Sequence, residues 1–250
     1  MRNQESLQAG LQELGLQADE KQLNQFDRFY ELLIEWNEKM NLTAITDYEE
    51  FVKKHLIDSM SLVKIYNLQE KEGTGERIRI LDMGTGAGFP GIPLRIMFQR
   101  AEFALMDSLN KRITFINEVI RQLGLTGITA IHARAEEYGK KAEYREQFDL
   151  CVSRAVARLN SLTEYCLPFV KEGGYFIPYK SGRIMEELEE ADYAITKLGG
   201  RRMKEETFRL PGSDIERTLI AIRKIRQTPA GYPRAGGKPL KAPLKIEKKS

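Results

Sequence analysis

From Ile78 to Gly182, short apolar runs alternate with helical patterns, and this alternation constrains the fold of the 250-residue chain more than any other feature. Such alternation predicts parallel strands joined by right-handed helical crossovers, hence a doubly wound α/β sheet. After Gly182 the sequence predicts a Glu-rich helix and two strands over 203–210 and 217–225. The turn of residues 211–214 between those strands is too short for a crossover, so we expect this last pair to be antiparallel.

The residues before about 70 have helical rather than strand periodicity. Apolar positions predict a helix over 20–40 with Asp19 as its N-cap. Asp47 followed by Glu50 resembles a capping box and predicts a second helix. We therefore expect a small N-terminal helical cap over 1–70, a sheet-forming domain over 71–226 and a C-terminal tail over 227–250.

Charge is distributed unevenly along the chain. The net charge is +3, but residues 223–250 contain nine Lys or Arg and one acid, a local charge of +8, which leaves −5 on the remainder. With four of the nine prolines, this basic segment is expected to be extended or partly disordered and to attract phosphate groups in a salt-sensitive way.

Composition also excludes several classes of protein. No apolar run approaches the ~18 residues that a membrane span needs, and the N-terminus MRNQESLQAG does not resemble a secretory signal. Cys151 and Cys166 are too few for a disulfide framework and too isolated for a cysteine-based metal site. We expect a soluble, cytoplasmic protein that binds no metal and, without sustained heptads, is a monomer.

The most informative motif is LDMGTGAGFPG over 81–91, which follows the first predicted strand and precedes a helix. Glycines at this position let the backbone turn sharply and approach a ligand at the carboxyl edge of the sheet. The spacing is G-x-G-x-G, because Phe89 stands where dinucleotide binders have their third glycine. The alternative is a tight turn without a ligand.

Acidic residues follow the next two predicted strands. Asp107 ends the second strand 23 residues after Gly84, where a carboxylate can accept hydrogen bonds from ribose hydroxyls. Alternatively, Asp107 caps the following helix, a role that Ser108 could also fill. Glu136 follows the third strand, beside the expected position of a nucleoside base, although a solvated acid at a helix start is the simpler interpretation.

Two cations, Arg154 and Lys180, follow the fourth and fifth strands and so lie at the same edge of the sheet. An arginine there could hold a carboxylate or phosphate through two hydrogen bonds, although either residue alone would more simply be a surface cation. In the N-terminal region, His55, Asp58 and Ser59 share one helical face. We interpret them as a polar patch that closes a cleft, not as a nucleophile triad.

These motifs resemble those of the bacterial 16S ribosomal RNA guanine-N7 methyltransferases, the RsmG or GidB type. The resemblance extends from about Trp36 to Lys224 and rests on MNLTAI, HLIDS, LDMGTGAGFPGIPL, LMDSLNKR, AEE, SRAVARL and ERTLIAIRK. It implies the seven-stranded class I fold, with S-adenosyl-L-methionine as cofactor and one guanine in the decoding region of 16S rRNA as target. Naked rRNA and an assembling small subunit both remain possible substrates.

The resemblance also implies roles for individual residues. It places the cofactor against Gly84, Gly86, Phe89, Asp107, Ser108, Ala135, Glu136 and Arg154. Arg154 and Lys180 are the candidate catalytic cations, which could hold the methionine carboxylate, an RNA phosphate or guanine O6. The candidate RNA contacts are Asn41, His55, Asp58, Lys180, Arg234, Lys238 and Lys241.

The chemistry of guanine N7 suggests a mechanism without a proton transfer. N7 has a free lone pair, so no general base is required, and alignment of the reacting atoms can contribute ~7–11 kcal/mol. Two alternatives from other classes are a nicotinamide-dependent oxidoreductase, because Asp107 also suits an NAD ribose, and an RNA-binding scaffold without activity.

Overall fold

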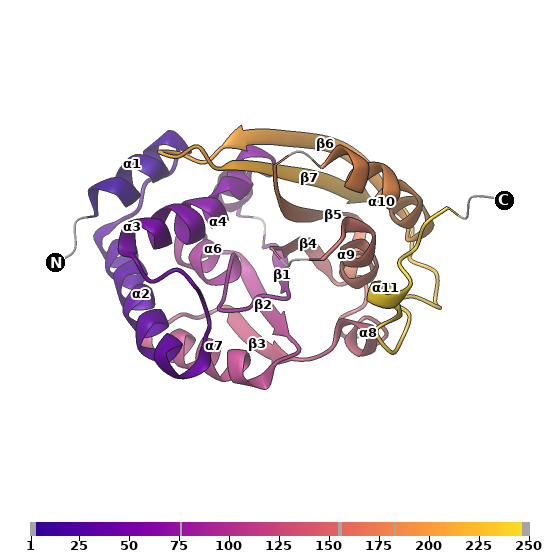
Figure 1. Cartoon of the computed structure of the whole chain (residues 1–250), viewed down its shortest axis with the longest axis horizontal. Helices are drawn as coiled ribbons and strands as arrows, with labels where there is room; N and C mark the ends of the chain where they lie inside the picture. Colours follow the sequence, from indigo (N-terminus) through magenta and orange to yellow (C-terminus); the bar gives the residue numbers. More distant parts are fainter. Residues whose placement is uncertain (1–3, 76, 155–156, 183, 247–250) are drawn as a thin grey trace.

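A computed structural model describes residues 4–75, 77–154, 157–182 and 184–246, and within them one seven-stranded sheet forms the centre of the molecule (Figure 1). The strand order is β3-β2-β1-β4-β5-β7-β6. Strands β1 to β5 pair in parallel, while β7 is antiparallel to both of its neighbours, β5 and β6. The predicted mostly parallel sheet with an antiparallel last pair is confirmed. The strands are β1 (Arg79–Met83), β2 (Glu102–Asp107), β3 (Ile128–His132), β4 (Phe148–Ser153), β5 (Val170–Ser181), β6 (Gly200–Arg209) and β7 (Glu216–Lys224).

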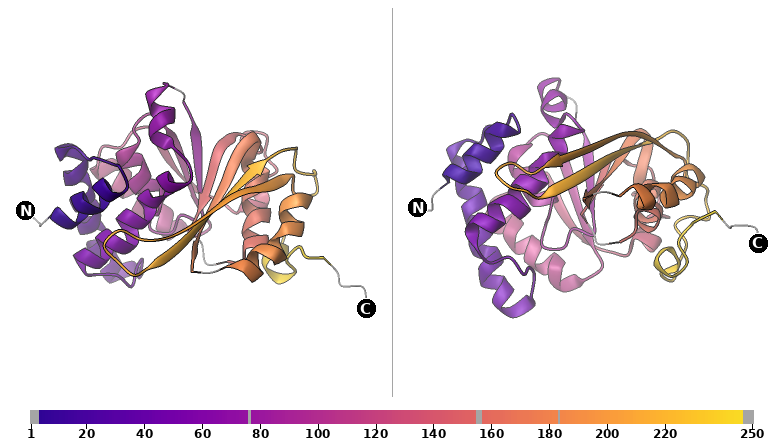
Figure 2. Two further views of the ribbon diagram at one scale, coloured as in Figure 1. Left: turned by 90° about the horizontal axis from the view of Figure 1, so that it is seen from above. Right: turned by 45° about the horizontal axis from the view of Figure 1, so that its top comes forward.

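Helices cover both faces of the sheet, which explains why every residue of β1 after Arg79 is buried (Figure 2). One face carries α6 (Gly91–Met97) and α7 (Asn110–Gln122), and the other carries α8 (Ala135–Tyr138), α9 (Leu159–Cys166) and α10 (Met185–Lys197). The apolar residues accordingly divide into two clusters, one on each side of the sheet.

The N-terminal helices pack on the α6–α7 side of the sheet and share its apolar cluster. Asp19 is the N-cap of helix α2 (Glu20–Met40), as the sequence predicts. Its side chain accepts from the Gln22 amide and the Gln22 side chain accepts from the Asp19 amide, which together form a capping box. Asp47 caps α3 (Tyr48–Phe51) by accepting from the Glu50 amide, which is one half of the capping box that the sequence suggested. The helix that follows is continuous but irregular: a π-helical segment η1 (Val52–Ile57), α4 (Asp58–Met60) and a 3₁₀ turn η2 (Ser61–Lys64).

Several short elements were not predicted from the sequence. They are α1 (Glu5–Glu13), α5 (Leu68–Gly73), the 3₁₀ turn η3 (Leu167–Phe169) and α11 (Lys238–Lys241). Within the described residues, no helix has both the length and the apolar character to cross a membrane.

The C-terminal tail packs against the body, which corrects the expectation of an extended segment. Arg145 donates hydrogen bonds to the carbonyl oxygens of Thr228 (2.6 Å) and Tyr232 (2.8 Å). Arg234 forms an ion pair with Glu164, a carboxylate in α9 that is completely buried. These polar contacts satisfy groups inside the protein, so the tail through α11 is part of the fold.

Candidate active site

The glycine-rich turn between β1 and α6 adopts a conformation that requires glycine. Gly84, Gly86 and Gly88 have φ angles of 69°, 61° and 94°, in the region that residues with a Cβ rarely adopt. A Cβ added at Gly86 would meet no atom within 4 Å, so the backbone is open to a ligand there. At Gly91, by contrast, a Cβ would lie 2.8 Å from Asp82 Oδ2 and from Leu105, so this last glycine permits close packing of helix on strand.

Asp82 lies beneath this turn and has a spare acceptor. Its Oδ2 accepts from Thr85 Oγ1 (2.6 Å) and the Gly91 amide (2.8 Å), whereas Oδ1 is buried with no hydrogen-bond partner among the described residues. Burial raises the pKa of this carboxyl to about 7. An unpartnered buried carboxylate oxygen suits a cationic ligand group, such as the amino group of a methionine moiety.

Asp107 ends β2 and organises the neighbouring loops. Its Oδ2 accepts from the Gly86 amide (3.0 Å) and Arg112 Nη1 (3.1 Å), and its Oδ1 accepts from the Leu109 amide (2.9 Å) at the start of α7. Leu109 is the N-cap residue of α7, which has no side-chain cap hydrogen bond, so Asp107 orders the loop before the helix and the helix-capping alternative is not what the structure shows. A ribose would have to share or replace these donors, and the ribose roles of Asp107 and of the exposed Ser108 stay predictions.

The expected adenine side of the site lies at the start of α8. Ala135 is buried there, and Glu136 Oε1 accepts from the amide of Gly237 (3.2 Å) in the tail. The tail thus reaches the acid that the resemblance assigns to the adenine, a contact that the sequence alone did not indicate.

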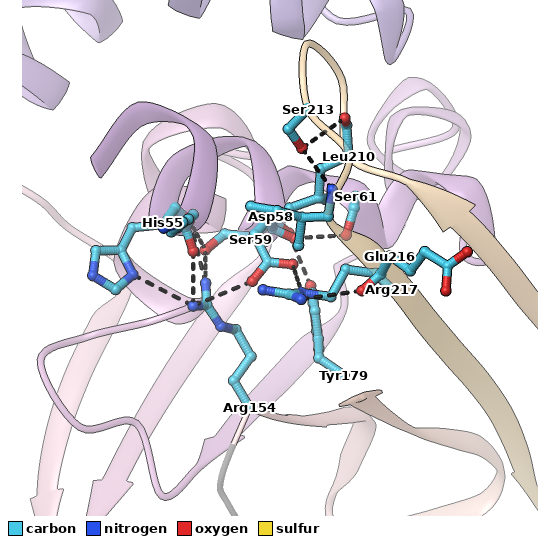
Figure 3. A network of polar contacts seen from close by, with 12 residues as sticks. His55, Asp58, Ser59, Ser61, Arg154, Tyr179, Leu210, Ser213, Glu216 and Arg217 are labelled. Atoms are coloured by element: carbon cyan, nitrogen blue, oxygen red, sulfur yellow. Dashed lines mark hydrogen bonds and ion pairs between the residues drawn. The ribbon is translucent and has the colours of Figure 1, made fainter. Parts of the chain in front are cut away.

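Arg154 connects the end of β4 to the irregular N-terminal helix (Figure 3). Its guanidinium donates to the carbonyl oxygens of Lys54 (3.1 Å) and His55 (3.3 Å) and to Ser59 Oγ (3.1 Å), and it pairs with Asp58 Oδ2 (3.3 Å). Asp58 Oδ1 also accepts from Nε of Arg217 (2.9 Å) on β7. The patch of His55, Asp58 and Ser59 predicted from helical spacing therefore exists, and it holds Arg154.

His55 packs directly on the glycine-rich turn. Its ring stacks on Phe89 with the centroids 4.2 Å apart and the planes 10° from parallel. Burial, followed by the charge of Arg154, lowers the pKa of His55 to about 3, so the ring is neutral at physiological pH. Nδ1 lies 3.4 Å from Arg154 and Nε2 lies 3.1 Å from Thr43 Oγ1, so both nitrogens are engaged.

A cavity of about 1030 Å³ opens beyond the carboxyl ends of β4 and β5. Arg154 connects this cavity to the turn, because it lines the cavity and its Cζ lies 5.6 Å from the Phe89 ring centroid. Lys180 also lines the cavity, and its Nζ donates to Glu187 Oε1 (2.6 Å) and to the Ala157 carbonyl (2.6 Å). The two candidate catalytic cations thus share one cavity.

Sequence reasoning missed three polar residues of this region. Arg217 and Glu187 line the cavity, and Asp82 supports the turn. Asp82 belongs to the motif LDMGTGAGFPG, and a charged residue inside an otherwise apolar strand was the signal that could have identified it. Arg217 and Glu187 reach the cavity from the antiparallel strand β7 and from α10, and their places depend on how those elements pack.

The remaining predicted RNA contacts lie outside the cavity. Asn41 ends α2 in a left-handed conformation, and Lys238 and Lys241 are exposed on α11. Arg234 forms an ion pair with the buried Glu164, and its contact with RNA stays a prediction. Ala155 and Val156 of the SRAVARL motif lie outside the described residues, within which no group of three or more His, Cys, Asp or Glu could hold a metal ion.

The sheet topology and the glycine-rich turn over a buried acid define the class I S-adenosylmethionine-dependent methyltransferases. Solved structures agree on the fold: MtNAS in complex with MTA and tNA has a TM-score of 0.53 at 17% identity, covering 80% of this chain and 74% of that one. The family model "GidB: rRNA small subunit methyltransferase G" matches residues 22–215, so the chain belongs to this family of S-adenosylmethionine-dependent rRNA methyltransferases.

Relatives with the name "Ribosomal RNA small subunit methyltransferase G" match the chain over nearly its whole length. The protein from Lachnoclostridium phytofermentans is 58% identical over 249 residues, which is 100% of both chains. The protein from Alkaliphilus metalliredigens is 50% identical and covers 96% of this chain and 98% of its own. Family membership excludes the nicotinamide-dependent oxidoreductase considered from the sequence.

Proposed function

We propose that the chain transfers the methyl group of S-adenosyl-L-methionine to N7 of one guanine in the decoding region of 16S rRNA. The observation that carries this proposal is the cavity beside the glycine-rich turn, with Arg154 at their junction, in a chain 58% identical over its whole length to a small-subunit rRNA methyltransferase. A ligand at the turn and a base in the cavity would then lie next to one another.

The residues of the turn fit the cofactor. Gly86 leaves room for close approach of its backbone, and Asp82 Oδ1, which no described residue contacts by a hydrogen bond, offers an acceptor for a cationic amino group. Asp107 and Glu136 are the acids at the ribose and adenine ends. When bound, S-adenosylmethionine supplies a methyl group on a positively charged sulfur.

Transfer to N7 needs alignment rather than proton removal. His55 is neutral and engaged through both ring nitrogens, so its role is to pack on Phe89 and shape the wall of the site. Holding N7 in line with the methyl group can contribute ~7–11 kcal/mol to lowering the barrier. An arginine that donated to N7 would block the reacting lone pair, so the cavity must bind guanine elsewhere.

We also propose where the protein acts and in which oligomeric state. The protein acts as a monomer in the cytoplasm, on 16S rRNA or on an assembling small subunit, and exposed lysines of the folded tail add sequence-independent attraction to phosphates. Sedimentation of the purified chain at micromolar concentration tests the monomer.

The substrate is tested in cells with and without the gene. Nuclease digestion and mass spectrometry of their 16S rRNA are expected to show loss of one 7-methylguanosine when the gene is removed, with recovery on complementation. An unchanged inventory of 7-methylguanosine would refute the assignment.

A further inference from the structure

Lys180 and Glu187 form an ion pair in the wall of the cavity. Lys180 stands near the end of β5 and Glu187 in the first turn of α10, with Nζ and Oε1 2.6 Å apart. Their side chains are 10% and 24% exposed, so the pair is sheltered but accessible from the cavity.

Among the residues that the structure describes, each partner of this pair leaves one hydrogen-bonding site unused. A lysine ammonium has three N–H donors, and Lys180 uses two, to Glu187 Oε1 and to the carbonyl of Ala157. Glu187 Oε1 accepts from Lys180 and from the Leu159 amide, while Oε2 accepts no hydrogen bond from any part of the chain that the structure describes. The pair therefore presents one donor beside one carboxylate oxygen.

This arrangement matches the Watson–Crick edge of guanine. On that edge the acceptor O6 lies beside the donor N1–H, followed by the N2 amino group, whereas adenine presents a donor beside an acceptor. Enzymes that act on an extruded base read it by hydrogen bonds to this edge. N7 lies outside it, so contacts here leave the reacting lone pair free.

We propose that Lys180 donates to guanine O6 while Glu187 Oε2 accepts from N1–H and N2–H, so that the pair selects guanine. This assignment rests on the proposed function, and it makes Glu187 the residue that determines the specificity for guanine. Glu187 is a recognition residue that takes no part in the methyl transfer itself.

The charges of the cavity favour a base over a phosphate at this place. Each lysine and arginine that the structure describes in the lining is already paired with a carboxylate. The pairs are Arg154 and Arg217 with Asp58, Arg158 with Glu190, and Lys180 with Glu187. A phosphate would bring a further negative charge next to Glu187, whereas a neutral base brings the donors that a carboxylate accepts.

Inosine provides the test, because it retains O6, N1–H and N7 of guanine but lacks the N2 amino group. Small subunits are reconstituted with 16S rRNA carrying guanosine or inosine at the target position, and kcat/KM for N7 methylation is measured on both. The wild-type protein is expected to prefer guanosine by about tenfold or more, the effect of one hydrogen bond to a charged group.

In the variant Glu187→Gln, the single amide oxygen stays with Lys180 and the Leu159 amide, so a donor NH2 group takes the place of Oε2. The variant is therefore expected to bring the guanosine-to-inosine ratio close to one. Glu189→Gln, an exposed position two residues along α10, should keep the wild-type ratio. Circular dichroism and cofactor affinity check that each variant is folded. A wild-type ratio in Glu187→Gln overturns the assignment.

The wild-type protein alone also decides the question if Glu187→Gln does not fold. Equal methylation of guanosine and inosine by the wild type overturns the role of Glu187 while the proposed function stands. Absence of 7-methylguanosine on guanosine subunits refutes the proposed function itself.

Discussion

At the scale of single residues, the protonation state of Asp82 is expected to control cofactor binding. Its pKa is raised to about 7, so in the free protein the carboxyl is mostly protonated at pH 6 and mostly ionised at pH 7.5. If its unpartnered Oδ1 faces the cationic amino group of the cofactor, binding favours the ionised form and releases a proton as it occurs.

We therefore predict that the affinity for S-adenosylmethionine rises about fivefold to tenfold between pH 6 and 7.5, because ionised Asp82 becomes the major form. Calorimetry in buffers of different ionisation enthalpy should detect the released proton. Asp82→Asn should bind more weakly and show little pH dependence over this range. The same pH dependence in wild type and variant would contradict this role of Asp82.

Among secondary-structure elements, the irregular N-terminal helix and strand β7 are joined through one buried carboxylate. Asp58 is 2% exposed and pairs with both Arg154 and Arg217. Removing one member of a buried ion pair leaves the others without compensation, at a cost of several kcal/mol.

Asp58→Asn is predicted to lower the free energy of unfolding by about 3 kcal/mol, the lower end of the usual range because both guanidinium groups keep some contact with water. Asp214→Asn is the control, since Asp214 is fully exposed and pairs with the exposed Arg209. Urea denaturation measures both. Equal stability of the two variants would show that Asp58 does not join these elements.

The sequence predicted the helices and strands more completely than it predicted the contacts between them. Apolar runs and caps such as Asp19 act locally, and they were sufficient to place the strands and α2. Glycine spacing located the turn, because a positive φ leaves a direct mark on the sequence. The partners of Glu187 and Arg217 were not predictable from the sequence. Glu187 meets Lys180, 7 positions away, and Arg217 meets Asp58, 159 positions away, and both contacts depend on how whole elements pack together.

For the molecule as a whole, the main revision concerns the C-terminal tail. It was expected to be an extended basic segment, but Arg234 compensates the buried Glu164, and Lys224, completely buried, donates to Thr228 Oγ1. The Pro and Lys residues of the tail do not indicate these contacts in the sequence, because the residues that they involve in the body, Glu164 on α9 and Lys224 at the end of β7, belong to other elements of the fold.

Arg234→Ala is predicted to destabilise the protein by about 3–5 kcal/mol, because Glu164 would be left as a buried carboxylate without its cation. Lys241→Ala, an exposed change on α11, should have no measurable effect on urea denaturation. Similar stabilities would mean that the tail is not required for the fold.

The exposed lysines of α11 are predicted to act on RNA binding alone. The double variant Lys238→Gln/Lys241→Gln should make the dependence of log affinity on log salt shallower by about 1–2 units, because up to two phosphate contacts are lost. Its unfolding curve should match the wild type. Lys21→Gln/Lys197→Gln, also exposed, is the matched control, and an equal change in both variants would show that α11 is not a distinct RNA contact.

The most direct measurement of the central claim uses purified protein, S-adenosylmethionine and small subunits from cells that lack the gene. After incubation, nuclease digestion and mass spectrometry locate any new methyl group in 16S rRNA. The predicted result is one 7-methylguanosine in a decoding-region fragment, formed in proportion to the cofactor consumed. No methylation of 16S rRNA, or methylation of another atom or base, would contradict the account.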